Sequence, residues 1–285
     1  MTKEPKHNDQ NPKVLWTHPT QSGIGDRLCD LLLLYSYVSI FDAELHFQWP
    51  QFPMKDIDVK HREEDIKLEN VSKYIKMPEK IFANSPLNPS NDGNVCVFDR
   101  YIGGGFSVEK FYEEYVQQKL PFEQYKESVE NVSKQFSFCD KKIIDYLSGI
   151  PKEFTAFHIR RGDKVREGTQ NDGNFINTVE LDHLDDITKK SIDFYSNPDA
   201  NTFFICGDED KKNQPFIDYA RSKQNKVFTS PDVPKWMGTY FDLAVLSKAK
   251  KIIISHRGSS FSRFASFIGG SELKTVYELE EQKAL

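Results

Sequence analysis

The second half of the chain alternates short apolar runs with longer helical patterns, and this order restricts the fold more than any other feature of the sequence. The predicted strands lie at 154–159, 202–206, 226–229 and 252–255, and the predicted helices at 181–195, 214–223 and 240–249. Residues 275–279 fit a last strand or a tail. Strands that alternate with helices pair in parallel and carry helices on the faces of their sheet. The sequence therefore predicts an α/β sandwich, with any ligand site outside the carboxyl ends of the strands.

The N-terminal half opens with a similar unit. Residues 14–16 predict a strand, residues 18–28 a loop that leads into a helix, and residues 44–49 the next strand. Apolar residues recur in the helix at intervals of three and four positions, which places one set on a single buried face: Leu28, Leu31, Leu32, Tyr35 and Val38.

The loop of this first unit contains a glycine pattern. Gly23 and Gly25 supply G-x-G, but Leu28 stands where a dinucleotide-binding fingerprint has its third glycine, so the pattern is a weak Rossmann signal. The loop still offers backbone N–H groups and a helix N-terminus to an anion, with Asp26 and Arg27 beside them.

The length of the chain predicts two domains. At 285 residues it is long for one domain and suits two of about 140 residues each. The mostly helical segment at 106–149 ends in Gly149 and is followed by Pro151, which is typical of a helix end before a linker. We therefore predict an N-terminal domain over residues 13–150 and a C-terminal domain over residues 151–285.

Charge and cysteine usage exclude several classes of protein. The formal net charge of −5 is unsuited to coating nucleic acid or an anionic membrane, so a bound anion needs a local basic cluster. The longest apolar run, 28–41, is interrupted by Asp30 and is too short to span a bilayer. The four cysteines form no Cys-x-x-Cys pair, and no apolar signal segment opens the chain. We expect a soluble cytoplasmic protein with reduced thiols and no metal site.

Polar residues follow the predicted strands at 158–164, 207–210 and 255–262, and the carboxyl ends of parallel strands share one edge. Arg160 and Arg161 could clamp a diphosphate, because the guanidinium fork matches phosphate oxygens and keeps its charge. A lone arginine pair also fits a solvated strand end whose charges pair with one another. The hydroxyls of three serines and the helix N-terminus that they open could cradle phosphate, although a plain serine cap has the same pattern: Ser259, Ser260 and Ser262.

The middle strand end carries the acids. Asp208 or Asp210 could accept the N1–H and 2-amino hydrogens of guanine, or could belong to an ordinary acidic loop. Together the three strand ends would grip both ends of a nucleoside diphosphate. The sequence has no Walker lysine motif, which argues against a P-loop ATPase. Because arginines can replace a metal ion as the diphosphate counter-charge, we predict chemistry that needs no metal.

Four segments resemble motifs of the superfamily that comprises the α1,2-, α1,6- and protein O-fucosyltransferases. The run HIRRGD from His158 to Asp163 resembles its HxRRxD motif, and the longer HIRRGDKV is most similar to the α1,6 branch. The helix from Asp242, DLAVLSKA, resembles the D-x-x-x-L-S-x-A helix of the superfamily. The serine-bearing segment 255–262 is similar to its phosphate loop, and GIGDRL from Gly23 to its N-terminal loop. The motifs cover about a fifth of the chain and occur in the order of the superfamily.

The resemblance implies a fold and an activity. The fold would be GT-B, with two Rossmann-like domains that face each other across a cleft. The activity would be inverting transfer of fucose from GDP-fucose, the donor substrate, to a glycan hydroxyl, with no cofactor. Partners would thus be a nucleotide sugar and a glycan acceptor.

The resemblance also implies roles for single residues. Arg160 and Arg161 would contact the GDP diphosphate, with Arg161 the indispensable one, while His158 would lie against the nucleotide. Further donor-site residues would bind guanine or phosphate or stabilise the site: Gly25, Arg27, Asp208, Asp210, Asp242, Ser259 and Ser260. The catalytic base would be Glu167, which stands one position nearer to the motif than the superfamily pattern has it. Asp163 and Asp26 are the other candidates for the base.

Two alternatives remain at this point. A GT-B transferase could use another nucleotide deoxysugar, because no motif in the sequence specifies which sugar the donor carries. A non-catalytic module could bind a nucleotide or a glycan, or act in adhesion through the Arg-Gly-Asp tripeptide at 161–163. Several aromatic residues could stack on the faces of an acceptor sugar, with the last expected to be exposed in a loop at 231–238: Trp49, Phe52, Tyr101, Phe106 and Trp236.

Overall fold

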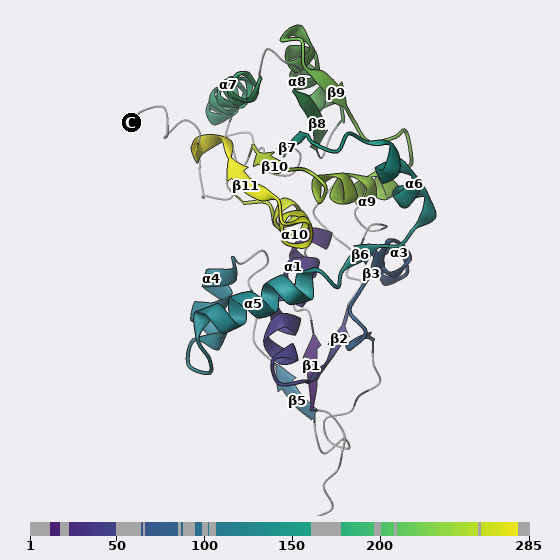
Figure 1. The fold of residues 1–285 in the computed structure, drawn as a ribbon, viewed down its shortest axis with the longest axis vertical. Helices are drawn as coiled ribbons and strands as arrows, with labels where there is room; N and C mark the ends of the chain where they lie inside the picture. The colour runs from purple at the N-terminus through teal and green to yellow at the C-terminus, as the bar shows by residue number, and fades with distance from the viewer. Residues whose placement is uncertain are drawn as a thin grey trace, which may run out of the picture.

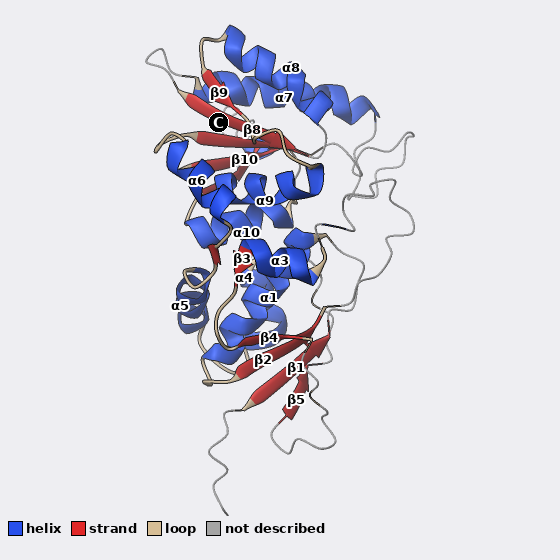
Figure 2. Cartoon of the chain, turned by 90° about the vertical axis from the view of Figure 1, so that its right-hand side faces the viewer, coloured by secondary structure: helices blue, strands red, loops and turns tan. Residues whose placement is uncertain are grey.

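The computed structural model contains two parallel β-sheets, one from each half of the chain, with helices packed between and around them (Figures 1 and 2). It describes residues 12–17, 23–49, 64, 66–84, 87, 95–98, 102, 107–160, 178–196, 201–207, 210–255 and 258–278, with only the backbone at 178–180 and 210. None of the helices in these ranges is long and apolar enough to cross a membrane.

The N-terminal sheet has the strand order β4-β2-β1-β5, and all its described pairings are parallel. Its strands are β1 (Lys13–Thr17), β2 (Glu44–Gln48), β4 (Ile81–Ala83) and β5 (Val95–Phe98). The two strands predicted around positions 14 and 44 are confirmed to within a residue or so at each end. Helix α1 (Ile24–Ser39) connects β1 to β2 and covers one face of the sheet (Figure 2).

Helix α1 differs from the sequence prediction in two respects. It begins at Ile24, so that Gly25, Asp26 and Arg27 lie in its first turn and not in a loop. It is also buried on nearly every side, whereas the spacing of its apolar residues indicated one buried face. The reason is tertiary: α1 packs against the N-terminal sheet, against α5 (Phe122–Ser133) and against α10 (Ser260–Gly269).

Helix α5 is attached to α1 by hydroxyl groups. Tyr125 donates a hydrogen bond to the Leu33 carbonyl at 3.0 Å, and Ser128 donates one to the Ser36 carbonyl at 2.6 Å. Shorter elements complete this half: α3 (Leu68–Tyr74), β3 (Ile75–Lys76), α4 (Val108–Phe111), the π-helical η1 (Tyr112–Val116), β6 (Ser137–Phe138) and α6 (Lys141–Gly149).

The C-terminal sheet has the order β11-β10-β7-β8-β9, again with every pairing parallel. Its strands are β7 (Thr155–Ile159), β8 (Thr202–Gly207), β9 (Lys226–Phe228), β10 (Lys251–Ile254) and β11 (Glu272–Thr275). From β7 the chain adds β8 and β9 on one side and then β10 and β11 on the other. The order therefore reverses between β7 and β10, and such a point is where open α/β sheets bind ligands.

The helices of this half are α7 (Thr178–Tyr195), α8 (Asp210–Ser222), α9 (Lys235–Leu246) and α10. Helix α8 begins at Asp210 and not at Gln214. Helix α9 begins at Lys235 and not at Tyr240, with Pro234 as its N-cap. The loop predicted at 231–238 is therefore confirmed at 231–234 and wrong at 235–238. A strand at 275–279 is also wrong, because β11 ends at Thr275 and a helical turn follows.

The two faces of the C-terminal sheet contribute to different cores. Phe157, Phe203 and Ile253 face the cluster that α7 and α8 complete. Ala156 and Ile254 point to the other face, where α9, α10 and the N-terminal half form one continuous cluster. The two halves of the protein thus share a hydrophobic core.

Helix α6 lies before the predicted domain boundary at residue 150 but packs on the second half of the chain. The Tyr146 ring contacts Phe241 of α9 edge to face with 5.5 Å between centroids, and its hydroxyl donates to the Thr229 carbonyl at 2.6 Å. The division at residue 150 stays a prediction.

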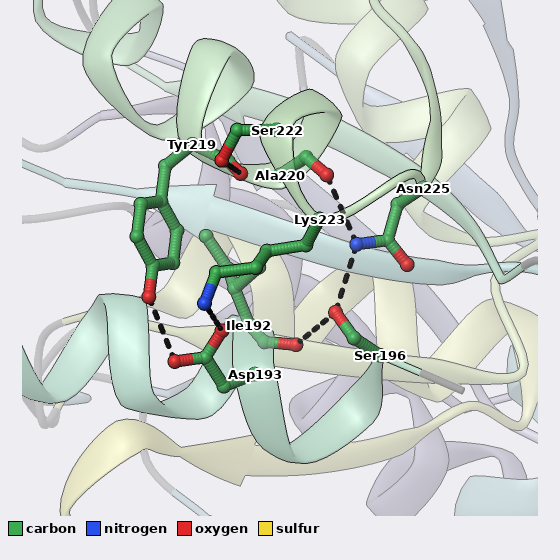
Figure 3. A network of polar contacts seen from close by, with 8 residues as sticks. All are labelled: Ile192, Asp193, Ser196, Tyr219, Ala220, Ser222, Lys223 and Asn225. Atoms are coloured by element: carbon green, nitrogen blue, oxygen red, sulfur yellow. Dashed lines mark hydrogen bonds and ion pairs between the residues drawn. The ribbon is translucent and has the colours of Figure 1, made fainter. Parts of the chain in front are cut away.

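The C-terminal ends of α7 and α8 are joined by the polar network of Figure 3. The buried Asn225 amide donates to Ser196 Oγ at 2.8 Å and to the Ala220 carbonyl at 3.0 Å. At the exposed side of the same network, Asp193 accepts from the Tyr219 hydroxyl at 2.7 Å and lies 3.2 Å from Lys223 Nζ.

We expect the buried and exposed parts of this network to differ in their contributions. Asn225→Ala should lower the free energy of unfolding by about 1–2 kcal/mol, because it leaves buried polar partners without a donor. Lys223→Ala, which removes an exposed ion pair, should change it little. Urea unfolding measures both. Equal losses for the two variants would contradict this assignment.

Candidate functional site

The site lies at the carboxyl ends of β7 and β10, where the strand order reverses. The register places His158 of β7 opposite Ile254 of β10. His158 is the second-last residue of β7, and Ile254 is the last residue of β10. Ser255 follows β10, and its N–H donates to the His158 carbonyl at 3.1 Å. Its hydroxyl accepts from the backbone N–H of Arg160 at 2.9 Å. Ser255 therefore fixes the backbone of Arg160 as it leaves β7.

The serine segment after β10 opens helix α10 above the same strand ends. Ser259 is the N-cap of α10, and its hydroxyl accepts from the Ser262 N–H at 3.4 Å. Serine is a preferred residue at this position because its oxygen satisfies one of the free N–H groups of the first turn. The predicted helix start is confirmed, and Ser260 is the first helical residue.

The His158 ring lies under this helix start. Its Nδ1 is 2.7 Å from Ser262 Oγ and 3.4 Å from Ser259 Oγ, and its centroid is 5.5 Å from that of Phe261. His158 and both serines are buried, with 4% or less of each residue exposed. The third residue of the helix turns inward, so the hydroxyl of Ser262 contacts the histidine. Its place in a phosphate cradle stays a prediction.

The first turn of α1 packs directly against the first turn of α10. A Cβ atom on Gly25 would lie 2.5 Å from Phe261 Cα and 2.9 Å from Ser260 C, so only glycine fits without displacing backbone. Cys29, one turn further along α1, donates its Sγ–H to the Ser260 carbonyl at 3.2 Å. The N-termini of the two helices, with their partial positive charges, therefore meet at this site.

Cys29 is a structural thiol. Burial raises the pKa of the Cys29 thiol well above its usual value, and the opposing charge of Arg263 is the smaller influence. A protonated thiol is a poor nucleophile.

Asp26 stands in the first turn of α1 next to Gly25 and is partly exposed, which places a carboxylate beside the start of α10.

Arg27 lies in the interior of the N-terminal half. Only 1% of it is exposed, and its guanidinium carbon lies 5.2 Å from the centroid of the Trp49 ring. Trp49 is itself buried and donates its indole N–H to the Ile66 carbonyl at 2.7 Å. The Trp49 ring is therefore part of the core, and it does not offer a free face to a sugar.

Trp236 lies in the first turn of α9 and is half-buried, and its ring centroid is 6.1 Å from that of Tyr74.

The end of β8 approaches β7 closely. A Cβ atom on Gly207 would overlap the carbonyl oxygen of Ile159 and would lie 2.6 Å from Asn213 Oδ1. The predicted guanine-binding residues follow here: the backbone of Asp210 begins α8, while its side chain and the whole of Asp208 lie outside the described residues.

Asp242 contacts the segment that follows β9. In α9 its carboxylate accepts a hydrogen bond from Ser230, which follows β9. Burial, and less strongly the Asp242 charge, raises the pKa of the neighbouring Tyr146. Asp242 thus fixes the segment after β9 in position.

Several predicted residues cannot be placed. Arg161, Asp163 and Glu167 lie outside the described residues, as do Phe52, Tyr101 and Phe106. Within the described ranges no group of three or more His, Cys, Asp or Glu residues is arranged to hold a metal ion. The sequence did not predict the hydrogen bond of Ser255 with Arg160 or that of Cys29 with Ser260. For Ser255, its position directly after a predicted strand could have indicated a role at the edge of the sheet.

Comparisons with known proteins identify the fold. Neither a protein-family model nor a curated protein sequence matches the chain. A crystal structure of NodZ α-1,6-fucosyltransferase soaked with GDP-fucose is similar with a TM-score of 0.50 at 13% sequence identity, over 91% of this chain and 93% of the other. POFUT1 in complex with GDP has a TM-score of 0.46 at 15% identity, over 94% and 98% of the two chains. A variant of Arabidopsis thaliana FUT1 with GDP has a TM-score of 0.46 at 11% identity, over 95% and 71%.

The predicted fold class, α/β of the GT-B type, is confirmed by the likeness to NodZ and by the two parallel sheets. NodZ, the structure with a TM-score of 0.50, is described as an α-1,6-fucosyltransferase.

Proposed function

We propose that this protein is a glycosyltransferase that moves fucose from GDP-fucose to a hydroxyl group of a glycan, with inversion at the anomeric carbon and without a metal ion. One observation carries the proposal: strand β7, which ends in the first two residues of the HxRRxD motif, and the serine-capped helix α10 meet at the point where the strand order of the C-terminal sheet reverses. In this proposal residues 151–285 bind the donor and residues 13–150 the acceptor.

The donor diphosphate would lie between the arginines and α10. Arg160 leaves β7 with its backbone held by Ser255, and Arg161 is the next residue. Guanidinium groups bind phosphate oxygens in a bidentate way, and the N-terminus of α10 adds N–H donors and a partial positive charge. Ser259 uses its oxygen as the helix cap, which leaves its O–H proton for a phosphate oxygen. Asp208 and Asp210 would bind guanine beyond the end of β8.

The transfer would be a single displacement. The acceptor oxygen forms a bond to the anomeric carbon of fucose while the bond from that carbon to the β-phosphate oxygen breaks. The acceptor proton passes to a carboxylate, and the electron pair leaves with GDP, whose growing negative charge the arginines stabilise. Glu167 and Asp163 are candidates for this base. Among the described residues Asp26 is the candidate, since it follows Gly25 at the contact with α10.

Nucleotide binding tests the proposal. Isothermal calorimetry in EDTA should show binding of GDP and GDP-fucose, and at least tenfold weaker binding of UDP and ADP, because only guanine offers adjacent N1–H and amino donors to a carboxylate. A preference for UDP or ADP would retain a nucleotide-sugar transferase and exclude fucose transfer. A strict need for Mg²⁺ would overturn the metal-free mechanism. If no nucleotide binds, the enzyme is excluded and a binding module remains.

A further inference from the structure

We infer that Ser262 is a positioning residue, which holds the neutral ring of His158 in the tautomer that carries its proton on Nε2. The inference rests on the proposed function for its purpose, because an Nε2–H group is a hydrogen-bond donor and can serve a phosphate of the nucleotide. The tautomer itself depends only on contacts within the protein.

The distance between the two side chains identifies a strong hydrogen bond but leaves its direction open. Ser262 Oγ and His158 Nδ1 are 2.7 Å apart, and a hydroxyl can donate or accept. In a neutral imidazole one nitrogen donates and the other accepts, so the direction of this bond decides the tautomer.

The surroundings of Ser262 decide the direction. Ser262 is fully buried, and the described residues give its hydroxyl no hydrogen-bond partner other than His158. If Nδ1 carried a proton and donated to Ser262, the hydroxyl proton of Ser262 would be buried without an acceptor. A buried polar group without a partner costs about 1–3 kcal/mol. The hydroxyl therefore donates to Nδ1, and the ring proton resides on Nε2.

Two further contacts keep this arrangement in place. The backbone N–H of Ser262 donates to the Ser259 hydroxyl oxygen, which ties Ser262 to the cap of α10. Phe261 packs beside the imidazole ring, 5.5 Å between centroids. Ser259 Oγ lies 3.4 Å from Nδ1, which makes this contact longer and weaker than the 2.7 Å contact with Ser262. The helix cap and the histidine are thus connected through one side chain.

The chain offers a matched control in the same helix. Ser266 of α10 donates its hydroxyl to the Ser271 carbonyl at 2.6 Å and has no contact with His158 among the described residues. Ser266→Ala and Ser262→Ala each remove one hydroxyl and one hydrogen bond from α10. Only Ser262→Ala should change the histidine.

The test is a two-bond ¹H–¹⁵N correlation spectrum of the histidine rings in the ligand-free protein at neutral pH. The His158 signals are assigned by their absence in His158→Gln. We expect the Nε2–H tautomer in the wild type and in Ser266→Ala, a mixture of tautomers in Ser262→Ala, and a return to Nε2–H in Ser262→Thr, which restores a hydroxyl. A wild-type ring protonated on Nδ1, or an unchanged tautomer in Ser262→Ala, would overturn the inference.

Calorimetry with GDP supplies the functional arm of the experiment. Ser262→Ala should weaken GDP binding about five- to tenfold, while Ser262→Thr and Ser266→Ala should bind as the wild type does. If Ser262→Ala changes the tautomer but binds GDP as tightly as the wild type does, then the Nε2–H group of His158 does not donate to a phosphate. If wild type binds no GDP but shows the expected spectra, the proposed function fails and the positioning of His158 by Ser262 stands.

Discussion

Gly25→Ala is expected to destabilise the protein by about 3 kcal/mol or more and to weaken nucleotide binding with it. A new Cβ atom there would lie 2.5 Å from Phe261 Cα and 2.9 Å from Ser260 C. Overpacking of a core typically costs about 1–3 kcal/mol when side chains can adjust. At Gly25 the obstacle is backbone, so one helix must move away from the other. That movement would also displace the Ser259 cap from His158.

Urea unfolding and GDP calorimetry measure these losses, and Gly23→Ala is the control. Gly23 caps the same helix in an extended conformation that alanine can adopt, and a Cβ atom there would meet nothing within 4 Å. Its replacement should change the free energy of unfolding by less than about 1 kcal/mol. Similar effects of the two alanines would show that α1 and α10 do not pack as described.

Arg161→Ala should reduce the affinity for GDP at least about 100-fold, which corresponds to about 3 kcal/mol. The expected cause is the loss of a bidentate, charge-assisted contact to the diphosphate. Arg161→Lys keeps the positive charge and loses the fork, so its affinity should fall between those of the wild type and the alanine variant.

The control for this prediction is Arg221→Ala, which removes the same charge from the exposed last turn of α8. Calorimetry in EDTA with equal protein concentrations should show wild-type affinity for this variant. If Arg161→Ala binds GDP as tightly as the wild type does, the diphosphate role of the motif is wrong, and the proposed transfer loses its means of stabilising the leaving group.

The elements that local pattern defines were predictable from the sequence. The runs that became β1, β7 and β10 are short and apolar, and the serines after β10 have the composition of a helix cap, so strand ends and the start of α10 could be placed. The start of α9 could not, because Pro234 and Gly238 have the composition of a loop. Packing against Tyr74 and the core overrides that local preference.

The contacts between segments far apart in the chain could not be predicted from the sequence. Gly25 was recognised as part of an anion-binding pattern, but its contact with Phe261 depends on how α1 and α10 cross. His158 and Ser262 both stood in recognised motifs, and the orientation of one helix above one strand makes them partners. The burial of Arg27 on Trp49 is of the same kind, since a guanidinium in a first helical turn gives no sign that it will enter a core.

The close approach of α1 and α10 also restricts how the two halves can move. Where backbone meets backbone at Gly25, no side chain is present that could change rotamer to absorb a displacement. A relative rotation of the halves would therefore use this point as its fulcrum, and displacement would grow with distance from it. The outer strands β5 and β9 would swing furthest. Asp26, His158 and the cap of α10 lie next to this point, so their mutual geometry would change least in such a rotation.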